Sequence, residues 1–146
     1  MISKNRIFNI QDPREFEEVA LAVFNFQAEN NPVYAEFLSH LKFKPEQPKD
    51  FSEIPFLPIQ FFKTHKIICG NRRSEKIFSS SGTSSMQQSR HFVTDLSFYR
   101  ESLEHGFRHF YGDFEDYTIF ALLPSYLERE GSSLIDMVEF WIEKSG

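Results

Sequence analysis

Residues 76–93 read KIFSSSGTSSMQQSRHFV, and the organisation of the chain follows from this stretch. Apolar segments at Lys76–Ser80 and Arg90–Val93 flank small hydroxyl side chains around Gly82, which predicts two strands joined by a polar loop. Glycine allows the backbone to turn tightly and to approach a ligand, and successive amides in such a bend can bind an anion. This serine-rich loop, residues 79–85, is a candidate phosphate site, and a solvated turn between strands is the alternative.

The segments before the loop favour a pair of helices. Residues 12–30 start with Asp12, Pro13 and Glu15, which is typical of a capped helix. A second helix is expected at 32–41, packed antiparallel against the first. Apolar spacing places these side chains in the core: Phe16, Val19, Ala20, Val23 and Phe24 from the first helix, and Val33, Phe37 and Leu41 from the second.

Four prolines fall in residues 45–58, where they remove backbone donors and disfavour helix. We therefore predict an extended connector. Its apolar side chains should hold it against the surface: Ile54, Phe56, Leu57 and Ile59. A short strand is predicted at His65–Cys69, and residues 70–73 would turn it toward the next strand.

Helix and strand alternate after the loop. A helix capped by Thr94 or Asp95 is expected to end near residue 110, with Leu96, Tyr99, Leu103, Phe107 and Phe110 on one face. A strand covered on both faces is expected at 117–123, followed by a last helix at 133–144 that starts at Ser133. The pattern predicts an α/β fold, with an N-terminal helical pair followed by a small sheet with helices.

The 146 residues carry a net charge of −5, which argues against a general nucleic-acid binder. The single cysteine excludes an internal disulfide. No apolar run is long enough to span a bilayer and no signal segment is recognised, so we expect a cytoplasmic protein. Phenylalanine occurs 18 times, which fits either an aromatic core or a pocket for an apolar or acyl ligand.

The serine-rich loop resembles the Ser-Ser-Gly-Thr-Thr-Gly phosphate loop of adenylate-forming enzymes. The similarity is greatest to phenylacetate–CoA ligases and to LuxE-type acyl-protein synthetases. Three neighbouring features resemble the family and occur in the same order along the chain. Phe24–Gln27 and Asn31–Tyr34 are similar to the helical pair of the LuxE type, and Ile54–Pro58 with Phe61–Lys63 is similar to the segment before the loop. Thr94-Asp95 matches the start of the helix after the loop.

This resemblance implies an ATP-dependent ligase that converts a carboxylic acid, such as a fatty acid, into an acyl-adenylate. The acyl group would then pass to a thiol, either of coenzyme A or of a protein cysteine. In the family the loop holds the β- and γ-phosphates of ATP while Mg²⁺ offsets their charge. Carried over, the nucleotide-binding residues are Ser80, Ser81, Gly82, Thr83, Ser84 and Ser85. No catalytic residue and no metal-ligating side chain is assigned.

The sequence departs from the family pattern at two positions. Ser85 replaces a second glycine, and Gln88 replaces a common lysine, whose role Arg90 could take. Motifs for an adenine pocket, an acid pocket and a mobile C-terminal domain are missing. We therefore expect residues 1–146 to be a single N-terminal segment of a LuxE-like enzyme, without its C-terminal remainder and inactive alone. The alternatives are a non-catalytic binding or assembly module and an unrelated α/β domain.

Three further groups have simpler interpretations. His105 and His109 have metal-ligand spacing but no third partner, so we interpret them as solvent-exposed. Cys69 is interpreted as a buried, unreactive thiol. A basic cluster near the loop fits either a solvated turn or a guide for ATP phosphates; it consists of Lys63, His65, Lys66, Arg72 and Arg73.

Overall fold

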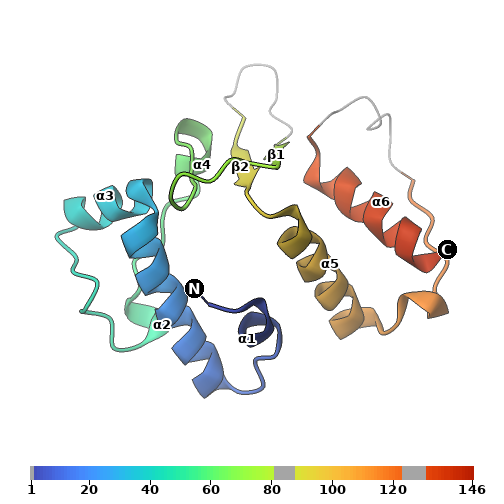
Figure 1. Ribbon diagram of the computed structural model, residues 1–146, viewed down its shortest axis with the longest axis horizontal. Coiled ribbons are helices and arrows are strands. Elements are labelled where there is room, and N and C mark those ends of the chain that lie inside the picture. The colour runs from blue at the N-terminus through green and yellow to red at the C-terminus, as the bar shows by residue number, and fades with distance from the viewer. Residues whose placement is uncertain (1, 81–87, 123–130) are drawn as a thin grey trace. The chain divides into compact units, whose positions relative to one another are not determined.

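The computed structural model describes residues 2–80, 88–122 and 131–146 (Figure 1). The chain forms two compact units, Met1–Arg73 and Ser74–Gly146, which we call unit 1 and unit 2. Helices predominate in the described residues, and one antiparallel pair of strands forms the sheet, so the mixed α/β class is confirmed. Among these residues, no helix combines the length and the apolarity that crossing a bilayer requires.

Unit 1 is helical in its described part. Its elements are α1 (Lys4–Phe8), α2 (Pro13–Asn30), α3 (Pro32–His40), the 3₁₀ helix η1 (Phe51–Glu53) and α4 (Phe61–Thr64). The helices expected at 12–30 and 32–41 are confirmed almost to the residue. The two shortest α-helices, α1 and α4, were not predicted, because five and four residues are too few to show a periodic pattern.

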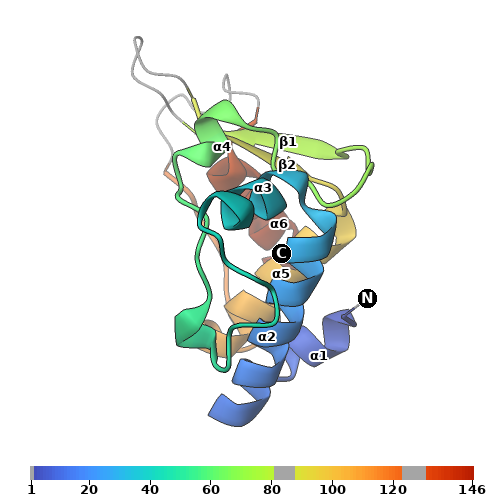
Figure 2. The ribbon, with the colours of Figure 1, turned by 90° about the vertical axis from the view of Figure 1, so that its left-hand side faces the viewer.

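Asn31 joins α2 to α3 by itself. Its backbone N–H donates to the carbonyl of Gln27 at 2.9 Å and ends α2. Its side-chain oxygen accepts from the N–H of Tyr34 at 3.3 Å and caps α3. Because one residue cannot reverse the chain, α3 lies across the C-terminal end of α2 in both views (Figures 1 and 2). The expected antiparallel pair is therefore wrong.

The core of unit 1 is an aromatic and aliphatic cluster. Its buried members are Phe24, Ala28, Tyr34, Leu38 and Ile54. The Tyr34 hydroxyl donates to the carbonyl of Pro55 at 2.6 Å, which holds the proline-rich connector in place as expected. Phe56 and Ile59 of that connector are nevertheless exposed.

Two side chains predicted for this core are exposed instead. Leu41 follows α3, whose crosswise orientation turns Tyr34 and Leu38 inward, so the inward face differs from the predicted one. Phe16 lies in the predicted apolar stripe of α2, but this stripe lines a cavity, described below.

The strand predicted at His65–Cys69 is wrong. His65 ends α4, and the residues that follow form no ladder. Gly70, with a φ of 63°, donates its N–H to the carbonyl of Asn30 at 2.6 Å. This bond ties the segment to the end of α2, so the chain does not turn into a hairpin at residues 70–73.

Unit 2 contains β1 (Lys76–Ser79), β2 (Arg90–Val93), α5 (Leu96–Tyr111), the 3₁₀ helix η2 (Phe114–Asp116) and α6 (Ser133–Ser145). The strands pair antiparallel from Lys76 opposite Val93 to Ser79 opposite Arg90, which confirms the strands predicted around the loop. Asp95 caps α5 by accepting from the N–H of Phe98 at 2.8 Å. The last helix is confirmed, but its cap is Ser132 and not Ser133.

Among the described residues of unit 2, Phe114 has the most deeply buried side chain, and it stacks on Phe107 with 4.0 Å between ring centroids. The strand predicted at 117–123 is wrong over residues 117–122, which lack regular structure; Leu123 lies outside the described residues. Phe120 is 90% exposed and Leu122 fully exposed, because no described strand pairs with this apolar run. Phe110 is also exposed, contrary to expectation.

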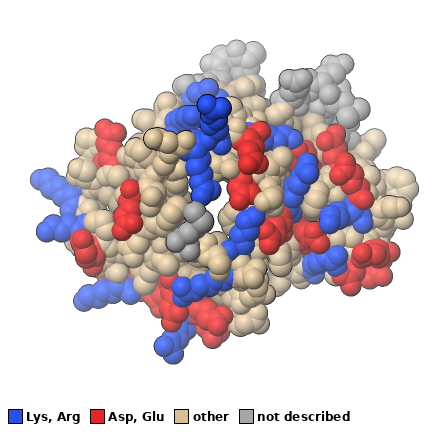
Figure 3. Space-filling view, viewed as in Figure 1, with Lys and Arg blue, Asp and Glu red and all other residues tan. Residues whose placement is uncertain are grey.

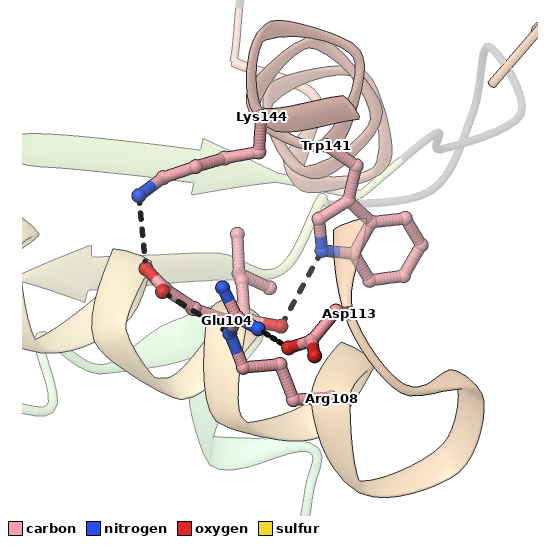
Figure 4. A network of polar contacts seen from close by, with 6 residues as sticks. Glu104, Arg108, Asp113, Trp141 and Lys144 are labelled. Atoms are coloured by element: carbon pink, nitrogen blue, oxygen red, sulfur yellow. Dashed lines mark hydrogen bonds and ion pairs between the residues drawn. The ribbon is translucent and has the colours of Figure 1, made fainter. Parts of the chain in front are cut away.

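A polar network joins α5 and α6 (Figure 4). Glu104 accepts from Lys144 at 3.1 Å and from Arg108 at 3.4 Å, and Arg108 also pairs with Asp113. The Trp141 indole N–H donates to the carbonyl of Leu103 at 3.4 Å. These contacts hold α5 against α6.

Candidate functional site

The described base of the serine-rich loop is a closed strand pair. Beyond the last ladder pair, the N–H of Ser80 donates to the carbonyl of Ser89 at 3.1 Å. The N–H of Ser89 donates back to the hydroxyl oxygen of Ser80 at 3.0 Å. These two bonds hold Ser80 and Ser89 together at the end of the strand pair.

A second segment meets this base. The N–H of Ser79 donates to the carbonyl of Gly131 at 2.8 Å. Gly131 has a φ of 88°, and a Cβ built there would lie 3.2 Å from the Ser79 hydroxyl oxygen. The positive φ favours glycine here, and the added Cβ would crowd the Ser79 side chain. Sequence reasoning missed this contact, because nothing local links Gly131 to a strand more than fifty residues earlier.

Of the six predicted nucleotide-binding residues, Ser80 alone lies within the described ranges. Its amide is already engaged with Ser89, and its exposed hydroxyl keeps a hydrogen to donate. The other five lie outside the described residues: Ser81, Gly82, Thr83, Ser84 and Ser85. The loop base is thus known, and the anion-binding part of the loop stays a prediction.

Arg90 stands at the loop base, opposite Ser79 in the ladder. Its guanidinium carbon lies 5.6 Å from the ring centroid of Phe92, two residues along the same face of β2. Within the described ranges no carboxylate pairs with this exposed cation. Arg90 can therefore offer a planar, bidentate donor to an anion next to the loop.

The basic cluster predicted near the loop belongs to unit 1, whereas the loop belongs to unit 2. His65 stacks on Phe61 at 4.9 Å and its Nδ1 lies 2.7 Å from the Thr64 hydroxyl. Lys66, Arg72 and Arg73 are exposed. On the face drawn in Figure 3, positive and negative side chains are interspersed.

Cys69 is half-buried, and its thiol donates to the Gln27 side-chain oxygen at 3.1 Å. Burial raises the pKa of the Cys69 thiol, only partly opposed by the positive charge of Arg72. A protonated thiol is a poor nucleophile, which supports the interpretation of Cys69 as unreactive.

His105 and His109 are exposed on α5, as expected. Across the described ranges, no cluster of three potential ligands is arranged to hold a metal ion.

Unit 1 contains an apolar cavity of about 500 Å³. The stripe of α2 predicted for the core forms one wall, and α1, α3, η1, α4 and the segments beside these helices contribute the rest. The lining includes Val19, Ala20, Val23, Phe24, Ile54 and Leu57. Sequence spacing revealed this stripe but could not tell a packed face from a cavity wall, since both require apolar side chains.

The chain is not significantly similar to any protein-family model, curated protein or solved structure in the comparisons made.

Proposed function

We propose that the chain is the N-terminal part of an ATP-dependent acyl-activating enzyme of the LuxE type. In the first step a carboxylate oxygen of the acid attacks the α-phosphorus of ATP. An O–P bond forms to this oxygen, the bond to the bridging oxygen of the β-phosphate breaks, and pyrophosphate leaves. In the second step a thiolate attacks the acyl carbon and AMP leaves.

The serine-rich loop would bind the β- and γ-phosphates in this proposal. The observation that supports it is the closed base formed by Ser80 and Ser89, with Arg90 beside it and free of any carboxylate in the described ranges. Because the strands that flank the loop are already paired, a bound phosphate would not have to bring them together, which lowers the cost of binding. Mg²⁺ would offset the remaining charge.

Arg90 compensates in this proposal for the missing lysine at Gln88. The Arg90 guanidinium can donate to two phosphate oxygens at once, and its contact with the Phe92 ring restricts the positions that it can adopt. A cation next to the pyrophosphate would matter most in the transition state, where charge moves onto the leaving group.

The test is carboxylate-dependent pyrophosphate release from Mg·ATP, measured with the protein encoded by the whole reading frame that contains this chain. A panel of acids of increasing chain length identifies the substrate. Arg90→Gln should lower the rate by about tenfold or more. Arg100→Gln, at an exposed position of α5, is the matched control and should leave the rate unchanged. Equal rates in both variants would remove Arg90 from the phosphate site, and no release with any acid would overturn the proposal.

A second candidate is a binding or assembly module without chemistry. The exposed aromatic and aliphatic side chains of unit 2 favour it, namely Phe110, Phe120 and Leu122. Such a module would release no pyrophosphate with any acid, so the same assay separates the two.

A further inference from the structure

The cavity of unit 1 has the size and lining of a small-molecule site. Its volume of about 500 Å³ falls within the range of roughly 300–1,000 Å³ typical of ligand pockets. Sixteen residues line it, thirteen of them apolar, and none is charged. A ligand there gains mainly by removing apolar surface from water.

Three aromatic side chains at the cavity are exposed although they are large and apolar: Phe16, Phe51 and Phe56. Phe16 and Phe51 meet edge to face at 5.4 Å, so the pair comes from two different elements, α2 and η1. Large exposed apolar side chains that line one cavity indicate a binding surface more often than scattered exposure does.

One polar group in this lining is oriented and unused. Gln27 lines the cavity, and its side-chain oxygen accepts from Asn31 Nδ2 at 3.2 Å and from the Cys69 thiol at 3.1 Å. The Asn31 amide is itself oriented, because its oxygen accepts from the Tyr34 N–H. Gln27 must therefore turn its NH₂ group away from both partners, and no acceptor in the described ranges bonds to it.

We propose that this cavity binds an aliphatic chain that ends in an uncharged carbonyl, such as an ester, thioester or amide. The apolar walls take the chain, and the Gln27 NH₂ group donates to the carbonyl oxygen. A carboxylate fits less well, because moving an anion from water into an apolar cavity costs free energy. No cation in the lining balances its charge. This site is separate from the serine-rich loop, and it is tested without ATP.

The probe is methyl octanoate, titrated into the 146-residue chain by calorimetry, with octanoate as the charged comparison. The ester should bind about tenfold or more tightly than the anion at neutral pH. Val23→Phe fills the cavity and should abolish binding, whereas Val33→Phe makes the same change on α3 outside the lining and should not. Circular dichroism of each variant confirms that the fold is kept.

Gln27→Glu tests the hydrogen bond. The carboxylate still accepts from Asn31 and Cys69 but cannot donate, so ester binding should weaken about fivefold to tenfold. No binding of the ester by the chain, or unchanged binding in Val23→Phe, would overturn the cavity site. Unchanged binding in Gln27→Glu would overturn the role of Gln27. Cosedimentation with phosphatidylcholine vesicles without binding of the free ester would show a membrane surface instead, and would also overturn the proposal.

Discussion

Lys76 of β1 and Asp136 of α6 form an ion pair that connects the strand before the serine-rich loop to the last helix. The Asp136 side chain is 10% exposed, and its second carboxylate oxygen is buried without a hydrogen-bond partner in the described residues. The Lys76 ammonium also lies 5.4 Å from the ring centroid of Phe78. One lysine thus balances a nearly buried charge at the position where β1 meets the helix.

Lys76→Met should destabilise the protein by about 2–3 kcal/mol, because it leaves the buried carboxylate without its cation. The double variant K76M/D136L removes both charges and should regain most of that loss. Urea unfolding of the two single variants and the double variant measures the coupling. A double variant as unstable as K76M would show that the ion pair does not determine the stability of this contact.

Gly131 and Gly106 offer a matched pair of substitutions. Gly131→Ala should destabilise by about 1–2 kcal/mol, because its φ of 88° is strained for alanine and the new Cβ would crowd the Ser79 hydroxyl. Gly106→Ala should stabilise by about 0.5–1 kcal/mol, because Gly106 lies within α5 and nothing is within 4 Å of its added Cβ. Thermal unfolding compares them, and shifts of the same sign would contradict the described base of the loop.

Acid should weaken the contact between α5 and α6. The hydrogen bond from Lys144 is the main cause that lowers the pKa of Glu104 below its ordinary 4.5, with Arg108 assisting and burial opposing. The folded state therefore binds this proton more weakly than the unfolded state. Glu104 contributes fully to the unfolding free energy above pH 4.5, and this contribution is lost as the pH falls through its lower pKa in the folded state.

Glu104→Gln removes this group, so its unfolding free energy should fall less steeply than that of the wild type below pH 4.5. The measurement is urea unfolding across the acidic range at low salt. Parallel curves for the two proteins would rule out Glu104 as the source of the acid sensitivity.

Alkali should loosen the connector in unit 1. Burial raises the pKa of Tyr34 from 10.0 to about 12, so folding favours the protonated phenol that donates to Pro55. Tyr34 contributes fully to the unfolding free energy below pH 10.0, and this contribution is lost as the pH rises through about 12. Tyr34→Phe should cost about 1 kcal/mol at neutral pH and lose this alkaline dependence. Ultraviolet difference absorbance of tyrosine ionisation checks it; if Tyr34 ionises at its ordinary pKa, its phenol is not buried in the core of unit 1.

The sequence predicted the elements whose signals are local. Asp12 and Asp95 each stand just before a periodic run of apolar residues, and each caps the helix that this run predicts. The strands beside the serine-rich loop were predicted because apolar residues bound a polar run on each side. Local capping and composition fix these features wherever the element lies in the fold.

The remaining errors concern tertiary partners. An apolar run at 117–122 has strand composition, but without a neighbouring strand in the described residues it stays irregular and exposed. The orientation of α3 depends on Asn31 serving as both C-cap and N-cap, which a periodic pattern does not show. The contact between Ser79 and Gly131 joins distant segments, and only the three-dimensional structure reveals it.

In the proposed function, the serine-rich loop binds the terminal phosphates of a nucleotide. The most direct test is calorimetric titration of Mg·ATP and of AMP into the whole encoded protein, with Gly82→Val compared to the wild type and Gly106→Ala as the control. Gly82→Val should weaken ATP binding by about tenfold or more and leave AMP binding unchanged, because AMP lacks the β- and γ-phosphates. Equal affinity of Gly82→Val and the wild type for ATP would contradict it.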